Sequence, residues 1–214
     1  MNPYFLMKSK RYVSLGVICV LGFLFVTNII TYKVQYERQA LLQQQLAEKV
    51  LRFHVLANSN SDKDQALKLC VRDAIGGYLQ ENLTMAGDKE TSKAVIAAHL
   101  GDIETIAEET ITKEGNDYKV TARLTECEFP IKTYGEYTFP AGTYEALQVI
   151  IGDGAGENWW CVLYPNMCFE NSIYEVVDDR AKEALREVLD QEEYEAILAS
   201  GKYEIRFRFL EWFR

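Results

Sequence analysis

Residues 156–165 read Gly156-Glu157-Asn158-Trp159-Trp160-Cys161-Val162-Leu163-Tyr164-Pro165, and a second cysteine follows at Cys168. A long apolar run directly after the glycine-rich segment 152–156 predicts a deeply packed strand that begins at a turn. The preceding apolar segment, 143–151, predicts a buried strand as well. We therefore expect 158–164 to return beside 143–151 as its hairpin partner.

The N-terminal sequence indicates on which side of a membrane the rest of the chain lies. Lys8, Lys10 and Arg11 precede a charge-free run from Tyr12 to Tyr32, and about 20 apolar residues are enough to span a bilayer. Positive charge before the run keeps the N-terminus in the cytoplasm, so the rest of the chain is expected to cross the membrane. We expect residues 1–32 to be a signal anchor or a cleaved signal peptide, 33–50 a helical stalk, and 51–214 a single exported domain.

The exported part is strongly acidic. The first 32 residues hold three of the 23 basic residues and none of the 32 acidic ones, which leaves a net charge of −12 beyond the membrane segment. Such a charge argues against nucleic acid or anionic lipid as a partner. The sequence predicts no cofactor and no small-molecule substrate.

Four cysteines lie outside the membrane segment, and an oxidising space permits disulfides. The sequence allows three complete pairings. Pro165 and Asn166 favour a chain reversal, so a Cys161–Cys168 disulfide is the expected one. Cys70 falls on an apolar helical stripe and is expected to be a buried thiol, whereas Cys127 either pairs with it or stays free.

Periodicity along the chain predicts an α+β domain. The sheet should be largely antiparallel, with helices packed on one face, preceded by the N-terminal membrane helix. Ser61 is expected to cap the first helix of the domain. The expected elements are a strand at 51–57, a helix from 61 to 82, a second helix at 90–112, strands at 118–125, 143–151 and 158–164, one or two helices at 178–200 with Gly201 as C-cap, and a closing strand at 203–209.

Candidate catalytic groups are few. Cys161 with His54 is the alternative to weigh, because a thiol and an imidazole form the nucleophile pair of some peptide hydrolases. Gly152-x-Gly154-x-Gly156 lacks the helix that a phosphate loop needs after its glycines. The adjacent acids Asp178 and Asp179 suit a helix N-terminus, and the cysteines and histidines lack metal-ligand spacing.

The aromatic segment 129–139 connects two predicted strands, and it serves either as ordered packing or as an exposed contact surface. Aromatic anchors are typical of protein interfaces. Together with the turn at 153–157, this segment supplies the expected partner-binding residues, which are Tyr134, Glu136, Tyr137, Phe139, Asp153 and Glu157.

Several long motifs resemble the stage II sporulation protein R family. They are Leu51-Arg52-Phe53-His54-Val55-Leu56-Ala57-Asn58-Ser59, Asp64-Gln65-Ala66-Leu67-Lys68, Val71-Arg72-Asp73, Lys132-Thr133-Tyr134-Gly135, Phe139-Pro140-Ala141-Gly142-x-Tyr144-x-Ala146-Leu147, the segment 156–165 with Cys168, and Phe207-x-Phe209-Leu210-Glu211-Trp212.

The resemblance implies an exported signalling protein that is not an enzyme. Members of the family are made in the forespore and act in the space between the two membranes. There they trigger a membrane-embedded aspartic protease of the mother cell, which removes the pro-sequence of the early mother-cell sigma factor. The competing hypothesis is an exported cysteine hydrolase that acts on peptide or cell wall with Cys161 as nucleophile.

Overall fold

The computed structural model describes residues 3–83, 87–167 and 179–200. The chain divides into two compact units, Met1–Leu42 and Gln43–Arg214. The predicted C-cap at Gly201 and the predicted strand at 203–209 lie outside the described residues.

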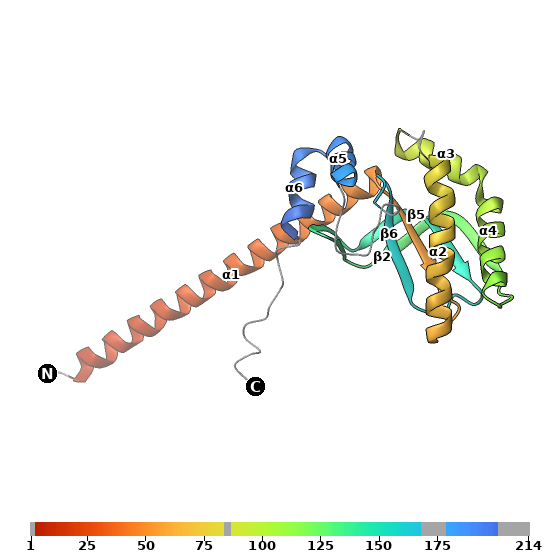
Figure 1. Ribbon diagram of the computed structural model, residues 1–214. Helices are drawn as coiled ribbons and strands as arrows, with labels where there is room; N and C mark the ends of the chain where they lie inside the picture. Colours follow the sequence, from red (N-terminus) through yellow and green to blue (C-terminus); the bar gives the residue numbers. More distant parts are fainter. Residues whose placement is uncertain (1–2, 84–86, 168–178, 201–214) are drawn as a thin grey trace. The chain divides into compact units, whose positions relative to one another are not determined.

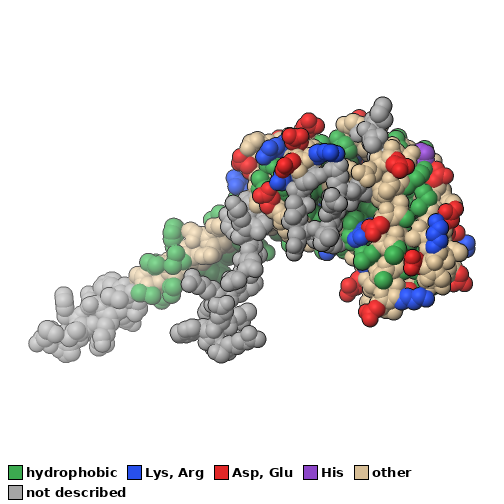
Figure 2. All heavy atoms as spheres, in the orientation of Figure 1, with side chains coloured by type: hydrophobic (Ala, Val, Ile, Leu, Met, Phe, Trp, Pro, Cys, Tyr) green, Lys and Arg blue, Asp and Glu red, His purple; other side chains and the backbone are tan. Residues whose placement is uncertain are grey.

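The first unit is the N-terminal part of helix α1 (Pro3–Lys49). By length and composition this helix can cross a membrane, and a signal sequence has the same properties. The described apolar side chains from Val17 to Val26 are largely exposed, and Figure 2 shows hydrophobic atoms on the surface of this helix. The apolar N-terminal helix expected from the sequence is therefore present.

The second unit begins with the last turns of α1, and its described residues contain a four-stranded sheet. Its strands are β2 (Val120–Phe129), β5 (Gly142–Ile151), β1 (Leu51–Leu56) and β6 (Asn158–Tyr164), in that spatial order. β1 runs parallel to β5, and the β1–β6 and β2–β5 pairs are antiparallel. The sheet is thus largely antiparallel, as the sequence predicts.

Three helices cover one face of this sheet (Figure 1): α2 (Asp62–Leu83), α3 (Lys89–Ala98) and α4 (Leu100–Lys113). Their apolar stripes enclose the core with Phe53 and Val55 of β1. Ser61 caps α2 as expected, because its hydroxyl accepts the Asp64 N–H at 3.1 Å. The fold class predicted from the sequence is confirmed.

The expected hairpin of 143–151 and 158–164 is wrong, because β1 lies between β5 and β6. The glycine-rich connection packs on the end of β1 instead. The N–H of Gly156 donates to Ala57 O at 2.9 Å, and that of Ala155 donates to Asn58 O at 3.1 Å. β1 is buried from Leu51 to Val55, so both of its edges and both of its faces need partners. β5 pairs with one edge and β6 with the other.

The single helix expected at 90–112 is also wrong, because it is broken at His99. This residue ends α3 with φ −111° and ψ 14°, and its N–H donates to Ile96 O. The helical ladder resumes when Ile103 N–H donates to His99 O. The imidazole is held by Tyr78 and Asp102. Figure 1 shows the chain changing direction between α3 and α4.

The aromatic segment after β2 forms a small ribbon of β3 (Lys132–Tyr134) and β4 (Tyr137–Phe139). The described residues after β6 form α5 (Asp179–Val188) and α6 (Gln191–Ser200). α6 packs against β4, and the hydroxyls of Tyr137 and Tyr194 lie 2.7 Å apart.

Candidate functional site

Two loops from distant parts of the sequence meet at one end of the sheet, and we call residues 57–61 and 152–157 the loop junction. Besides the two backbone bonds to Ala57 and Asn58, side chains tie the loops together. Asn60 Oδ1 accepts the Glu157 N–H at 2.7 Å, and Asn58 Oδ1 accepts the Asp153 N–H at 3.0 Å. Because backbone donors of a glycine-rich turn need partners when packed, the two asparagines fix its conformation.

Asp64, at the start of α2, forms hydrogen bonds with two residues of the loop junction. Its carboxylate is nearly buried and accepts hydrogen bonds from Ser59 Oγ at 2.6 Å and Asn58 Nδ2 at 2.9 Å. The hydrogen bonds from Ser59 and then Asn58 lower the pKa of Asp64, so it is ionised. Lys68, one turn further on, donates to Glu157 O at 2.9 Å, and burial lowers its pKa.

Behind the ribbon lies an arginine cage, which consists of Arg52 and the rings of Phe129, Tyr134, Phe139 and Tyr144. Arg52 is fully buried. Its guanidinium carbon lies 4.3 Å from the centroid of Phe129 and 5.0 Å from that of Tyr144, distances suited to cation–π attraction.

The hydrogen bonds of Arg52 complete the cage. Its Nε donates to Cys161 O at 3.0 Å and its Nη2 to Tyr134 Oη at 3.1 Å. Nη1 is buried without a hydrogen-bond partner among the residues that the structure describes. Burial raises the pKa of Tyr144 to about 12, although the charge of Arg52 opposes that shift. The cage therefore acts as packing around a fixed cation.

The alternative nucleophile pair is not formed, because Cys161 and His54 lie on opposite faces of the sheet. Cys161 is 2% exposed and belongs to the core with Phe53. His54 lies on the face away from the helices and stacks on Trp160, with ring centroids 4.9 Å apart. Its Nε2 lies 3.3 Å from the sulfur of Cys127.

This His54–Cys127 contact has the wrong protonation for a nucleophile pair. Burial lowers the pKa of His54 to about 4, and the charge of Arg52 contributes to the shift. Burial also raises the pKa of the Cys127 thiol. Both groups are then neutral at pH 7, whereas a reactive cysteine needs a thiolate stabilised by a nearby positive charge.

Comparison with known proteins identifies the family. The sequence model of stage II sporulation protein R matches residues 47–174. The chain belongs to the stage II sporulation protein R family. It is 34% identical over 179 residues to the protein of that name from Bacillus subtilis (strain 168), an alignment that covers 82% of this chain and 77% of the relative. No solved structure matches the chain.

Membership of the stage II sporulation protein R family confirms the resemblance found in the sequence and supports a role in sporulation signalling. The loop junction and the arginine cage both lie within the matched residues. Within the described residues, most of the motifs that carried the resemblance thus meet in space, and the motif at 207–212 lies outside those residues. Those from 51–59, 64–68 and 156–165 build the junction, and those from 132–135 and 139–147 build much of the cage.

The six residues predicted to bind a partner divide into two groups in this family member. Tyr134, Tyr137 and Phe139 are buried, so the aromatic segment is ordered packing within the domain. The remaining three side chains are exposed at turns, and these are Glu136, Asp153 and Glu157. Sequence reasoning missed Arg52, although a charged residue between apolar strand positions was a visible signal.

The cysteines divide similarly. Cys70 and Cys127 are free thiols, and Cys70 is half-buried on α2. Cys161 is buried in the middle of β6, within the strand that the sequence predicts. Cys168 lies outside the described residues, so the Cys161–Cys168 disulfide stays a prediction.

The other candidate sites named from the sequence are the glycine-rich loop, the adjacent acids and a metal site. β6 follows the glycine-rich loop directly, so this loop lacks the helix of a phosphate site. Asp179 lies in the first turn of α5, and Asp178 lies outside the described residues. Within residues 3–83, 87–167 and 179–200, no three His, Cys, Asp or Glu side chains are grouped as metal ligands.

Proposed function

We propose that this chain is an exported sporulation signalling protein that activates a membrane-embedded aspartic protease of the mother cell. The activated protease then processes the pro-form of the early mother-cell sigma factor. Family membership over most of the chain is the observation that carries the proposal. The protein acts by binding and carries out no reaction of its own.

Export is supported by the N-terminus. An apolar helix long enough to cross a membrane follows Lys8, Lys10 and Arg11, an arrangement that places the following domain across the membrane. The domain would reach the intermembrane space from the forespore, either tethered by α1 or released from it.

The rival cysteine hydrolase is disfavoured by the sheet geometry. Cys161 lies against Phe53 in the helix-covered core, whereas the imidazole of His54 lies on the other face. A general base must come within hydrogen-bond reach of its nucleophile, and the sheet itself separates these two groups.

For the contact with the protease we propose the exposed turns that carry Glu136 and, in the loop junction, Asp153 and Glu157. Buried aromatic side chains of the ribbon fix the first turn, and hydrogen bonds to Asn58 and Asn60 fix the second. Little freedom is therefore lost on binding. Acidic side chains are spread over the visible face from α5 and α6 to α4, with Lys and Arg between them (Figure 2). Binding that favours the active arrangement of the protease would shift its equilibrium toward that state.

The test is co-expression of the protease and its pro-sigma substrate in a non-sporulating host, with and without this chain. We expect processing only when the chain is present. Equal processing without it refutes the proposed function.

The contact surface is tested separately in the same host. Glu136→Ala and Asp153→Ala should each lower processing, while Glu109→Ala, an exposed acid on α4, should leave it unchanged. Wild-type processing by both turn variants removes the proposed surface and leaves the function standing.

A further inference from the structure

β2 is an end strand of the described sheet, and α4 covers the first half of its outer edge. The N–H groups of Val120 and Ala122 point away from β5. They donate to carboxylates of α4, at 3.3 Å to Glu108 Oε1 and at 2.8 Å to Glu104 Oε1. Because an unpaired strand edge is a template for another strand, these two glutamates close this part of the edge.

The second half of the edge, residues 124–128, is what we call the open edge. The pairing of β2 with β5 continues through it without a register shift, so the N–H groups of alternate residues keep pointing outward. These N–H groups belong to Leu124, Glu126 and Glu128. Among the described residues no strand lies beside them. The open edge can therefore bind one further strand through main-chain hydrogen bonds.

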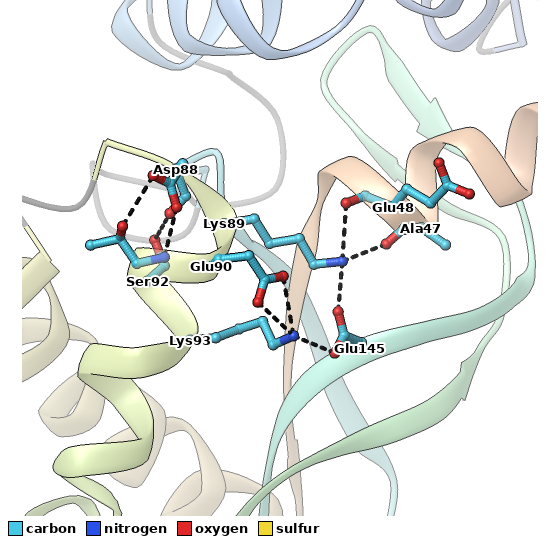
Figure 3. Close-up of polar contacts among 9 residues, drawn as sticks. Ala47, Glu48, Asp88, Lys89, Glu90, Ser92, Lys93 and Glu145 are labelled. Atoms are coloured by element: carbon cyan, nitrogen blue, oxygen red, sulfur yellow. Dashed lines mark hydrogen bonds and ion pairs between the residues drawn. The ribbon is translucent and has the colours of Figure 1, made fainter.

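One face of the open edge is acidic. Glu126 and Glu128 are exposed, and Glu126 lies opposite Glu145 of β5. The two lysines of α3 on this face, Lys89 and Lys93, both bind Glu145, with Nζ–Oε distances of 2.8 and 2.6 Å (Figure 3). In the described part of the chain this leaves the two edge glutamates without an ion pair. A second copy paired antiparallel here would bring these carboxylates together, which is unfavourable.

The opposite face of the open edge is aromatic and partly covered. Cys127 is half-buried, and its sulfur is the one that contacts the ring of His54. Phe129, at the end of β2, packs on Trp160 with ring centroids 4.7 Å apart. A strand that fits the open edge therefore needs basic side chains on one face and apolar side chains on the other, in strict alternation.

The end of this chain has that alternation. Residues 203–209, which lie outside the described residues, read Tyr203-Glu204-Ile205-Arg206-Phe207-Arg208-Phe209. We propose that the open edge binds this C-terminal segment as an antiparallel fifth strand, with Phe207 opposite Cys127. The inference rests on the edge of β2 and on the sequence of the segment, and it does not depend on the partner of the domain.

This register satisfies both faces of the open edge together. Arg206 is opposite Glu128 and Arg208 is opposite Glu126, and opposite charges directly across a strand pair are stabilising. The apolar residues of the segment then lie on the aromatic face. A shift by one residue would place the arginines on that face instead, so the alternation specifies the register.

The course of the described chain fits an antiparallel strand. Such a strand enters the open edge at the Phe129 end of β2. Phe129 lies beside β4, because its ring and that of Phe139 both contact the guanidinium of Arg52, at 4.3 and 5.3 Å. α6 packs against β4 and ends at Ser200. The connection from there to Ile205 can span about 17 Å when extended, so the segment reaches a neighbouring element without a long loop.

A disulfide tests the register in the full-length protein, held in detergent micelles. The N–H of Cys127 points toward β5, so Cys127 and the residue opposite it across the open edge form a non-hydrogen-bonded pair. Their Cα atoms should lie about 4.5 Å apart, within reach of a disulfide. Phe207→Cys in oxidised glutathione should therefore join the introduced thiol to Cys127 of the same chain, as measured by peptide mass mapping.

Arg208→Cys is the matched control, because its thiol would lie on the acidic face. Its yield of the bond to Cys127 should be at least about tenfold lower. Equal yields from the two variants, no bond to Cys127 in Phe207→Cys, or a bond that joins two copies of the chain each overturn the proposal.

Charge reversal tests the pairing without a disulfide. Chymotrypsin cuts after aromatic residues, so the rate of the cut after Phe209 in the full-length protein measures how often the strand leaves the edge. Glu126→Arg and Arg208→Glu each place like charges opposite one another, and each should speed this cut about fivefold. Glu109→Arg, a change at an exposed acid on α4, should leave the rate unchanged.

The double variant Glu126→Arg/Arg208→Glu decides the outcome. It restores an opposite-charge pair, so its rate of cutting should return to within about twofold of wild type. A double variant cut as fast as either single variant overturns the proposal. Neither measurement involves the protease or the sigma factor, so a failure here leaves the proposed function standing.

Discussion

Gly156→Ala perturbs the loop junction at its tightest point. A Cβ built on Gly156 would lie 2.6 Å from the carbonyl carbon of Ser59 and 2.9 Å from the Cβ of Ala57, and closer still to Ser59 O. Real Cβ atoms essentially never approach other atoms within 3.0 Å. Because the obstacle is backbone, no side-chain rotation relieves it, and one of the two loops must move.

The cost follows from what that movement breaks. Overpacking in a close-packed site costs about 1–3 kcal/mol. Separation of the loops also weakens the hydrogen bond from Gly156 N–H to Ala57 O and that from Glu157 N–H to Asn60 Oδ1, each worth roughly 0.5–1.5 kcal/mol. We expect the free energy of unfolding to fall by about 3 kcal/mol, a large share of the roughly 5–15 kcal/mol typical of a domain.

Urea unfolding of the full chain in detergent, followed by tryptophan fluorescence, measures this change, because Trp159 is buried on β6, which directly follows the loop junction. Gly77→Ala is the control. Gly77 lies in α2 with nothing within 4 Å of its built Cβ, so alanine there should stabilise the helix by about 0.5–1 kcal/mol. A Gly156→Ala protein within about 0.5 kcal/mol of wild type would refute the packing argument.

Two further predictions concern buried polar groups. His54 has its pKa lowered from 6.5 to about 4, so the unfolded chain binds more protons between these values. Stability should therefore fall by about 3 kcal/mol as the pH drops from 6.5 to 4. His54→Gln should remove that part of the pH dependence, and a pH dependence in this variant like that of wild type contradicts the assignment. Tyr194→Phe should cost about 1–2 kcal/mol by urea unfolding, because it leaves the buried Tyr137 hydroxyl without its partner. Adding Tyr137→Phe should recover part of that loss, and strictly additive costs would show that the hydroxyls are not coupled.

Local patterns predicted much of the fold. The charge-free run, the Ser61 cap, the alternation in β2 and the apolar runs of β5 and β6 all depend on residues near one another in the sequence. Those elements are present, although β2 runs from Val120 to Phe129 and therefore begins and ends later than the expected strand at 118–125. The family motifs were equally local, and they identified the family before any contact between them was known.

The position of β1 could not be obtained in this way. A glycine-rich turn between two apolar strands favours a hairpin, and nothing near 152–156 shows that a third strand lies between them. In β1 the apolar residues Leu51, Phe53 and Val55 alternate with the polar residues Arg52 and His54, a pattern that favours one exposed face. In the structure all five are buried. A charged residue within such a strand indicates either an exposed face or a specific buried partner, and only the rings of the cage distinguish these two cases.

For the candidate catalytic residues too, the local sequence predicted the element but not the neighbours. Cys161 and His54 were correctly placed on strands, but their faces depend on the register between β1 and β6, where His54 is opposite Trp160 and Phe53 is opposite Cys161. A shift of one residue would exchange the faces. The contact of His54 with Cys127 depends in turn on β5 lying between β1 and β2.

The central place of β1 also sets the order in which the sheet can form. β1 is synthesised before the other strands, yet its neighbours are β5, which pairs Ala146 with Arg52, and β6, which pairs Val162 with the same residue. Contacts between residues so far apart in the sequence close slowly. Until the ribosome has supplied the chain as far as Tyr164, at least one edge of β1 lacks its partner strand and the four strands of the described sheet cannot all pair. Under the export that we propose, a chain with its first strand in this position would still be unfolded when its N-terminal helix reaches a membrane, which is the state that passage through a translocation channel requires.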